Sequence, residues 1–313
     1  VERSRGLGDV YKRQKVHFTD SEFNPYSTID IPEKDKLGWP PTLLFYQPEL
    51  ETIIRSNNLN YKNLKILENA EAVNIQNTNP VQIDIKNNRK DSTVYCKYLV
   101  GCDGANSFVR KYIKAKLIDF GFDQDWIVID AHTTKQIDIS KDEAKQICDP
   151  NRLKTYVPGR RNHKRFEFKL LEGETKKDFT KNKVWELLSP WINKNNSKIE
   201  RAVVYKFHAC IADKWRDKNI FIAGDAAHQM PPFLGAGMGT GIRDAFNLAW
   251  KIYLIIKGMA EENLLETYQQ EREPHANWTI QQAKLIGQMM EQFSYREKGC
   301  LLYTSDAADE GLG

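Results

Sequence analysis

The chain has 313 residues, of which 41% are hydrophobic, so it is long and apolar enough to form a packed core, and this argues against disorder. Lys and Arg number 46 against 42 for Asp and Glu, and these scattered charges form no basic stripe of the kind that binds nucleic acid. No apolar run approaches the ~20 residues of a membrane span and no signal peptide is visible, so we expect a soluble, cytoplasmic protein.

The two ends of the chain are related to each other at the level of DNA. Residues 9–14 can be encoded by a string whose reverse complement, read one base in, encodes residues 300–304. Such inverse copies resemble adapter DNA translated at both ends of a fragment, so we expect 1–14 and 300–313 to be non-native. On this interpretation Gly6-Leu7-Gly8 is not half of a dinucleotide-binding loop, and the native gene extends past both ends.

Between those ends, helical and strand patterns alternate without internal repeats. The first expected elements are a helix at 47–55, strands at 81–85 and 94–100, and a short helix at 107–113. The next are strands at 126–131, 155–157 and 165–171 and a helix at 183–192. The last are a strand from Asn219, a loop rich in Gly and Pro, and helices at 241–257 and 262–292. The pattern predicts a mixed segment at 15–116, a sheet-rich domain at 117–207 and a strand-and-helix segment at 208–299.

The cysteines and histidines indicate no metal centre. The five cysteines include no CxxC pair and have no regular spacing, which argues against a disulfide framework or a zinc site. His208 and Cys210 would share one face of a strand, but two ligands do not complete a tetrahedral site. We therefore expect no bound metal. A homo-oligomer is compatible with the sequence, which leaves the oligomeric state open.

The strand that begins at Asn219 is followed by residues suited to ligand binding. It delivers Gly224 and Asp225 to the carboxyl end of a sheet, where ligands of open α/β folds bind, and an Asp there can accept hydrogen bonds from sugar-like hydroxyls. The glycines that follow let the backbone approach a ligand, and the next helix points its positive end at an anionic ring or phosphate. These glycines are Gly235, Gly237, Gly239 and Gly241. Alternatively, Gly224-Asp225 is only a turn, and the glycines merely separate a strand from a helix.

The whole run from Gly224-Asp225 through Pro231-Pro232 to Asp244, Asn247 and Trp250 resembles the second FAD-binding signature of flavoprotein aromatic hydroxylases, the p-hydroxybenzoate hydroxylase fold. Upstream, 98–110 with Asp103-Gly104 and Arg110 resembles the DG motif of that family, which lies near the FAD pyrophosphate and is linked to the reduced nicotinamide cofactor. An Asp-Gly turn that caps a helix is the alternative for this second motif.

Two further stretches narrow the resemblance to the 3-(3-hydroxyphenyl)propionate hydroxylase branch. They are 38–51 and 149–168, the latter with Tyr156-Val157-Pro158-Gly159 and Arg165-Phe166-Glu167-Phe168. Gln47 matches a glutamine that in this family approaches the ribityl and phosphate part of the flavin, whereas Glu49 and Glu51 are interpreted as surface residues of a helix. The family commonly has Gly-Gln-Gly-Met-Asn where this chain has 235–239, and the N-terminal GxGxxG is missing.

The resemblance implies an α/β fold, with a three-layer FAD-binding domain whose first βαβ unit is missing and a sheet-based substrate domain. It also implies a monooxygenase with FAD as cofactor, in which NAD(P)H reduces FAD and O2 is used to hydroxylate a phenolic aromatic acid. The second hypothesis is a non-catalytic flavin-binding fragment or relative. The sequence does not fix the phenol or the choice of NADH or NADPH, and we expect the chain alone to bind FAD poorly and to be inactive.

The candidate site residues follow from these motifs. The cofactor-binding candidates are Gln47, Asp103, Gly104, Arg110, Gly224, Asp225, Pro232, Gly235, Gly237, Met238 and Gly239. The catalytic candidates are His228 and Pro232, and a histidine beside a cofactor loop is more often structural than catalytic. Tyr205, Phe207 and Phe233 are candidates for a substrate pocket, but they could equally belong to the core.

Overall fold

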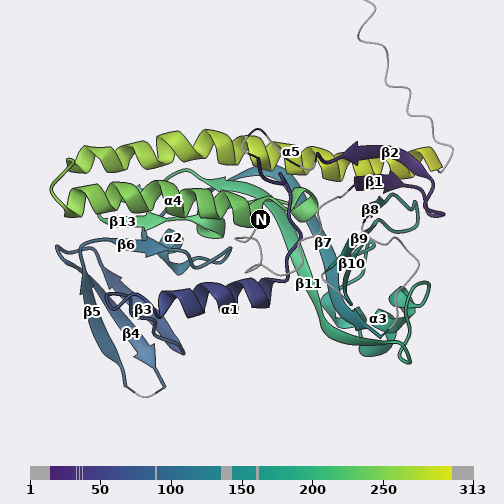
Figure 1. Cartoon of the computed structure of the whole chain (residues 1–313), viewed down its shortest axis with the longest axis horizontal. Helices are drawn as coiled ribbons and strands as arrows, with labels where there is room; N and C mark the ends of the chain where they lie inside the picture. Colours follow the sequence, from purple (N-terminus) through teal and green to yellow (C-terminus); the bar gives the residue numbers. More distant parts are fainter. Residues whose placement is uncertain are drawn as a thin grey trace, which may run out of the picture. The chain divides into compact units, whose positions relative to one another are not determined.

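The computed structural model describes residues 15–32, 34, 36, 38–88, 90–134, 143–159 and 162–297 (Figure 1). The two ends predicted to be non-native lie outside these residues. The chain forms two compact units, here called unit 1 (1–64, 124–206 and 288–313) and unit 2 (65–123 and 207–287). Three long elements contribute residues to both units: β7 (Leu117–Thr133), β11 (Ser197–Ala212) and α5 (Thr267–Glu297).

Unit 1 is built on a sheet in the order β11-β7-β10-β9-β8-β1-β2. Its further strands are β1 (Lys15–Thr19), β2 (Pro25–Asp30), β8 (Ala144–Ile147), β9 (Lys154–Pro158) and β10 (His163–Lys169). β1 and β8 are parallel, whereas β8, β9, β10 and β7 pair antiparallel in turn. The sheet therefore has a continuous central region in which side chains alternate between two faces.

One face of this sheet packs against a helix and the other carries polar residues. The helix is α3 (Lys181–Leu188), which follows the short 3-10 turn η2 (Lys176–Asp178). The apolar core on this face comprises Ile127, Ile129, Ala131, Tyr156, Phe166, Phe168, Val184, Leu188 and Ile192. Alternation places Val128 and Asp130 of β7 on the opposite face. The same unit contains α1 (Gln47–Asn58), which begins with Pro48 in its first turn and buries no residue.

Unit 2 has a layered architecture. One layer is the antiparallel sheet of β3 (Ala70–Gln76), β4 (Val81–Asn87) and β5 (Ser92–Cys96), and another is the sheet of β12 (Arg216–Asp217), β13 (Ile220–Ile222) and β6 (Leu99–Gly101). The third layer consists of α4 (Gly237–Ile256) and the first part of α5, which run side by side in Figure 1. The remaining elements are α2 (Phe108–Tyr112), η3 (Gly224–Ala226), β14 (His228–Gln229), η4 (Pro232–Leu234) and η5 (Glu262–Glu266).

The core of unit 2 joins these layers. It includes Ile75 and Val81 of the antiparallel sheet, all of β13, and Leu248 of α4. The layers of unit 2 and the sheet of unit 1 confirm the expected α/β class. Within the described residues, no helix is both long and apolar enough to cross a membrane.

Three of the expected elements were wrong in detail. The strand expected at 94–100 is two strands, because β5 pairs with β4 whereas β6 pairs with β13 in another sheet. The helix expected from Gly241 begins at Gly237, so Gly237 and Gly239 lie in its first turn rather than in a loop. The helix expected from Glu262 begins as the 3-10 turn η5 and becomes α-helical at Thr267.

Candidate functional site

The two motif loops leave the same edge of one sheet in unit 2. β6 and β13 run parallel with Gly101 opposite Ile222, so the chain after each strand emerges at their common carboxyl end. After β6, the Asp103 carboxylate accepts hydrogen bonds from Ser107 Oγ at 2.5 Å and from the Val109 amide at 3.0 Å. Asp103 therefore fixes the start of α2, and Gly104 beside it has a positive φ of 75° that favours glycine.

Arg110 holds the two loops together. Its Nη1 donates to the carbonyl of Ala226 at 2.9 Å and its Nη2 donates to the carbonyl of Ala105 at 2.6 Å. The side chain is buried, with 6% of the residue exposed. The structure thus gives Arg110 a positioning role, and its predicted contact with a cofactor stays a prediction.

Asp225 presents its carboxylate at the carboxyl end of β13. It lies in η3 after Gly224, whose φ of 61° is in the left-handed region, and it is exposed. Among the described residues, no side chain or amide donates a hydrogen bond to it. Desolvation raises the pKa of Asp225 and the neighbouring His228 opposes this shift. The carboxylate is therefore available to accept hydrogen bonds from a ligand.

The start of α4 provides a region of positive potential in the same unit. Gly235, with φ 60°, ends η4, and its amide donates to the carbonyl of Pro232 at 2.7 Å. The helix then runs for 20 residues from Gly237, so the free amides of its first turn carry the positive end of the helix dipole. Met238 in this turn is 46% exposed. The predicted residues Pro232, Gly235, Gly237, Met238 and Gly239 are therefore brought together around a helix start that suits an anion.

Two glycines allow α4 to approach the Asp225 turn. A Cβ atom added to Gly241 would lie 3.3 Å from the Cα atom of Gly224, which is tighter than ordinary contact. The backbone of the helix thus packs against the backbone of the motif loop. Gly241, predicted as part of a ligand loop, has this packing role inside the helix.

A buried ionic cluster around Asp244 holds the Gly224 turn in place. Asp244 of α4 accepts hydrogen bonds from His228 Nε2 at 2.6 Å, from Arg272 Nε at 2.8 Å and from the Gly224 amide at 3.1 Å. Asp244 and His228 are completely buried. Burial works to raise the pKa of Asp244, but the hydrogen bonds from His228, Arg272 and Gly224 outweigh it and lower that pKa. The cluster ties the Gly224 turn to both helices.

His228 therefore supports the site rather than facing a ligand. Its Nε2 is used by Asp244, its ring packs 5.4 Å from the ring of Trp215, and its buried Nδ1 has no hydrogen-bond partner among the described residues. The sequence signal named His228 and Asp244, but nothing in it pointed to Arg272, because that residue lies on the next helix. A catalytic role for His228 or Pro232 stays a prediction.

The three aromatic candidates for a substrate pocket belong to different units. Phe207 and Phe233 meet in unit 2 with ring centroids 6.2 Å apart at right angles, and Phe233 is packed against Phe122. A Cβ atom on Gly287 of α5 would lie 2.8 Å from Phe233 and 2.9 Å from Phe122, so these two rings pack against the backbone of that helix. Tyr205 belongs to unit 1, where its hydroxyl accepts a hydrogen bond from Arg201 Nη1 at 3.2 Å.

Gln47 also belongs to unit 1. It is the first residue of α1, it is exposed, and its Nε2 donates to Glu51 Oε1 at 2.8 Å one turn later. The helix start predicted around Pro48 is confirmed. The predicted approach of Gln47 to a flavin is not tested by these contacts.

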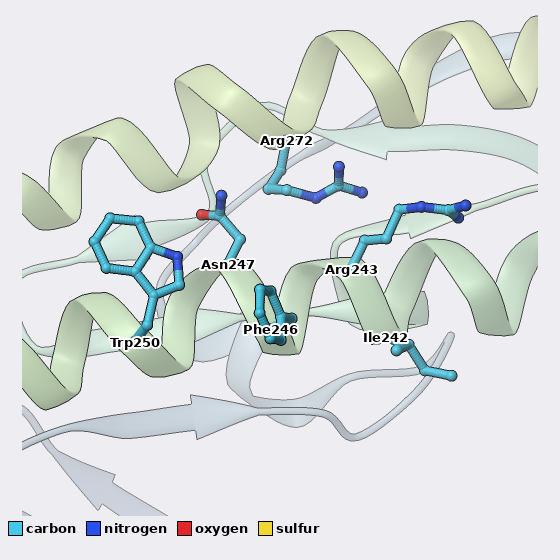
Figure 2. Close-up of a pocket in the computed structure, with 6 residues that line it drawn as sticks. All are labelled: Ile242, Arg243, Phe246, Asn247, Trp250 and Arg272. Atoms are coloured by element: carbon cyan, nitrogen blue, oxygen red, sulfur yellow. The ribbon is translucent and has the colours of Figure 1, made fainter. Parts of the chain in front are cut away.

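A pocket of about 380 Å³ lies along α4 and α5 (Figure 2). Figure 2 shows Arg272 reaching from α5 toward the residues of α4. The lining residues are Ile242, Arg243, Phe246, Asn247, Trp250 and Arg272. Asn247 donates through Nδ2 to Glu271 at 2.7 Å, and its Oδ1 has no partner among the described residues. The sequence placed Asn247 and Trp250 in the signature without assigning them this location.

Comparison with known proteins shows the family to which the chain belongs. The sequence model of the FAD binding domain family matches residues 3–283. The chain is 33% identical over 266 residues to a probable NADH-specific resorcinol 4-hydroxylase of Rhodococcus jostii, covering 83% of this chain and 50% of that protein. It is 35% identical over 266 residues to a 3-(3-hydroxy-phenyl)propionate/3-hydroxycinnamic acid hydroxylase of Escherichia coli, covering 83% of this chain and 47% of that protein. The chain thus spans about half the length of the curated relatives it matches.

Solved structures have the same fold. The p-nitrophenol 4-monooxygenase of Pseudomonas putida matches with a TM-score of 0.80 and 17% identity, over 93% of this chain and 74% of that chain. Aklavinone-11 hydroxylase, in a complex with FAD and aklavinone, matches with a TM-score of 0.77 and 21% identity, over 87% of this chain and 54% of that chain. At these identities the likeness shows the fold alone.

Proposed function

Because the chain belongs to the FAD binding domain family, we propose that the protein containing it is a flavin monooxygenase that hydroxylates a phenolic aromatic acid with NAD(P)H and O2. The names of the relatives support this class, since one is described as acting on resorcinol and another on 3-(3-hydroxyphenyl)propionate. The acid is favoured over the neutral phenol because the stretches at 38–51 and 149–168 resemble the phenylpropionate branch.

The observation that carries the proposal is the open carboxylate of Asp225 in the same unit as the positive start of α4. The residues present fit FAD, because the cofactor offers hydroxyl groups to a carboxylate and anionic groups to helix amides. In this assignment Asp225 accepts hydrogen bonds from ribityl hydroxyls. The first turn of α4, at Gly237 to Gly239, stabilises negative charge on the bound cofactor.

Other residues of the chain act by holding these two features in place. Arg110 keeps the turn after β13 against the turn after β6, and Asp244 keeps it against α4. FAD, when bound, supplies the electron transfer from NAD(P)H and the reaction with O2. The protein residues therefore bind, orient and exclude water, and Phe207 and Phe233 stay candidates for an apolar wall near the substrate.

The test uses the full-length parent protein. We expect it to purify yellow with bound FAD and to oxidise NAD(P)H faster when 3-(3-hydroxyphenyl)propionate is added, with one oxygen atom of labelled O2 found in the product. A full-length protein that binds FAD but forms no hydroxylated product from a panel of phenols would instead support the alternative of a flavin-binding relative without monooxygenase activity. A full-length protein that does not bind FAD would overturn the proposal entirely.

A further inference from the structure

One face of α4 in unit 2 carries large apolar side chains that are exposed within the part of the chain that the structure describes. They recur every three or four residues, so they share one side of the helix over about 27 Å at 1.5 Å per residue. The helix buries its opposite side around Asp244 and Leu248. The exposed side, here called the α4 stripe, consists of Met238, Ile242, Phe246, Trp250, Tyr253 and Ile256.

The α4 stripe differs from the scattered apolar side chains of an ordinary surface. Phe246 in its middle is 77% exposed, and its neighbours along the stripe are exposed as well. Contiguous exposed apolar side chains mark surfaces that bind another protein element. Ile242, Phe246 and Trp250 also line the pocket of about 380 Å³ (Figure 2). The face therefore offers both apolar surface and a hollow to an element that packs on it.

A buried acceptor in the same pocket lacks a donor. Asn247 Oδ1 is a buried atom without a hydrogen-bond partner among the described residues, whereas the Nδ2 of the same side chain donates to Glu271 at 2.7 Å. Native proteins rarely leave such an atom unpaired. An element that covers the pocket would satisfy Asn247 by donating an N–H or O–H.

The parallel sheet of unit 2 has an open edge at β6. This strand is the last in its sheet, and no other described strand pairs with its second side. The Leu99 amide donates to Asn219 at 2.9 Å and the Gly101 carbonyl accepts from Ala223 at 3.0 Å, both on the side of β13. Backbone polar groups alternate in direction along a strand, so the N–H and C=O of Val100 point to the open side. Such an edge can pair with a further strand.

We propose that the α4 stripe and the open edge of β6 form one docking surface for a strand joined to a helix, supplied by the part of the parent protein outside residues 15–299. The strand continues the sheet beside β6, and the helix packs its apolar side on Phe246 and Trp250. The chain covers only 50% and 47% of two curated relatives, which leaves room for such a unit in a parent of similar length. The proposal does not depend on the substrate of the protein.

Two other occupants account for fewer of these observations. A second copy that docked through its own α4 stripe would bring helix against helix and leave the N–H and C=O of Val100 unpaired. A membrane surface would cover apolar side chains but offers no strand to β6. Helices that lie in a membrane surface also keep their polar side in water, whereas the polar side of α4 is buried around Asp244. One strand joined to a helix satisfies the stripe, the edge and Asn247 together.

The experiment identifies the occupant by photo-cross-linking in the full-length parent protein. The photoreactive residue p-benzoylphenylalanine is placed at Phe246, so that one aromatic side chain replaces another. After irradiation we expect an intramolecular cross-link to a peptide outside residues 15–299, identified by mass spectrometry, in a protein of monomer mass. The control carries the same group at Tyr95, which is 62% exposed on β5 in the other sheet of unit 2. It should give no cross-link to that peptide.

Hydrogen exchange tests the edge of β6 in the wild-type full-length protein. The Ile222 amide, which donates to the carbonyl of Trp215 at 3.0 Å, is the reference for a paired amide of the same sheet. If a strand pairs with the open side of β6, the Val100 amide should exchange within about tenfold of the Ile222 rate. An edge that stays open would let Val100 exchange at least about a hundredfold faster.

Each outcome supports or overturns the proposal. A cross-link from position 246 to a second molecule, to a peptide within residues 15–299, or to nothing in a folded protein overturns it. If the substituted protein does not fold, the exchange of Val100 in the wild type decides, since slow exchange supports the proposal and fast exchange overturns it. Neither measurement depends on hydroxylation, so a parent protein that shows the expected cross-link but hydroxylates no phenol would overturn the proposed function alone.

Discussion

Replacement of Asp244 by asparagine tests whether the buried ionic cluster holds the motif loop of unit 2. The carboxylate accepts from His228 Nε2, Arg272 Nε and the Gly224 amide, all within 3.1 Å. An asparagine keeps the volume but has no charge and presents two donors of its own. Its single oxygen can still accept a hydrogen bond, but Arg272, 7% exposed, would lose its ion pair with the Asp244 carboxylate.

Breaking a buried ion pair by removing one partner costs about 3–5 kcal/mol, which is a large share of the ~5–15 kcal/mol that stabilises a domain. We therefore expect Asp244→Asn to lower the free energy of unfolding of unit 2 by an amount in this range. Urea unfolding followed by circular dichroism and tryptophan fluorescence measures it, with separate transitions allowed for the two units. Glu266→Gln, an exposed carboxylate on η5 in the same unit, is the control.

The difference in unfolding free energy between wild type and Asp244→Asn should change with pH in one direction. Because the pKa of Asp244 is lowered in the folded state, its contribution is present above the ordinary value near 3.8 and is lost as the pH falls through the lower folded value. The gap in unfolding free energy between wild type and Asp244→Asn should therefore shrink in acid. A loss of less than about 1 kcal/mol at pH 7 would refute the reasoning, since a buried pair cannot be broken at so small a cost.

Three further predictions each concern a single residue. Asp225→Ala should weaken FAD binding by the full-length apoprotein about tenfold to a hundredfold in a fluorescence titration, whereas Glu266→Ala should bind FAD like the wild type. Equal affinities of the two variants would show that Asp225 is only a turn residue. Because the folded state holds the Glu167 proton more tightly than the unfolded state, wild type should lose up to roughly 3 kcal/mol relative to Glu167→Gln between pH 4.5 and 7; parallel urea curves at both pH values would contradict this. Gly101→Ala would put a Cβ atom 2.5 Å from Val109 Cβ, so overpacking should cost about 1–3 kcal/mol in thermal unfolding, and a silent substitution would show that the contact is not tight.

Asp213 is a poor control for Asp225, and only the structure shows why. Asp213 is an exposed carboxylate that precedes β12 in the sequence. In the fold its Oδ1 accepts a hydrogen bond from the Lys116 amide at 2.8 Å. Its replacement would perturb a contact between distant segments, whereas the exposed Glu266 avoids that complication.

The parts of the site that the sequence predicted are those that depend on local chemistry. An apolar strand followed by Gly224-Asp225 determines where a carboxylate leaves a sheet, and Gly104 and Gly235 occupy positive-φ positions at loop turns. These positions are set by the backbone within a few residues. The α/β class followed for the same reason, because alternating strand and helix patterns persist along the chain.

The parts that the sequence missed depend on partners far away in the chain. The run at 94–100 has uniform β propensity, and it divides only because its two halves pair with β4 and β13 in separate sheets. The start of α4 was misplaced because glycine propensity predicts a loop at Gly237 and Gly239, whereas these residues form the first turn of a helix that packs through Gly241 on Gly224. Tertiary contact overrode local preference in both cases.

Asp244 and Glu167 are two carboxyl groups whose pKa values the fold shifts in opposite directions. Both are buried and titratable, and both lie in stretches that resemble family motifs. His228 is joined through Nε2 to Asp244, which is itself held by Arg272, so the charge of that carboxylate is balanced inside the protein. Glu167 has no comparable ion pair among the described residues, and Arg165, the cation that acts on it, is bound to Asp130. The two groups therefore predict opposite responses to pH: the contribution of Asp244 to stability is lost as the pH falls through its lowered folded pKa, whereas wild type loses stability relative to Glu167→Gln as the pH rises toward 7.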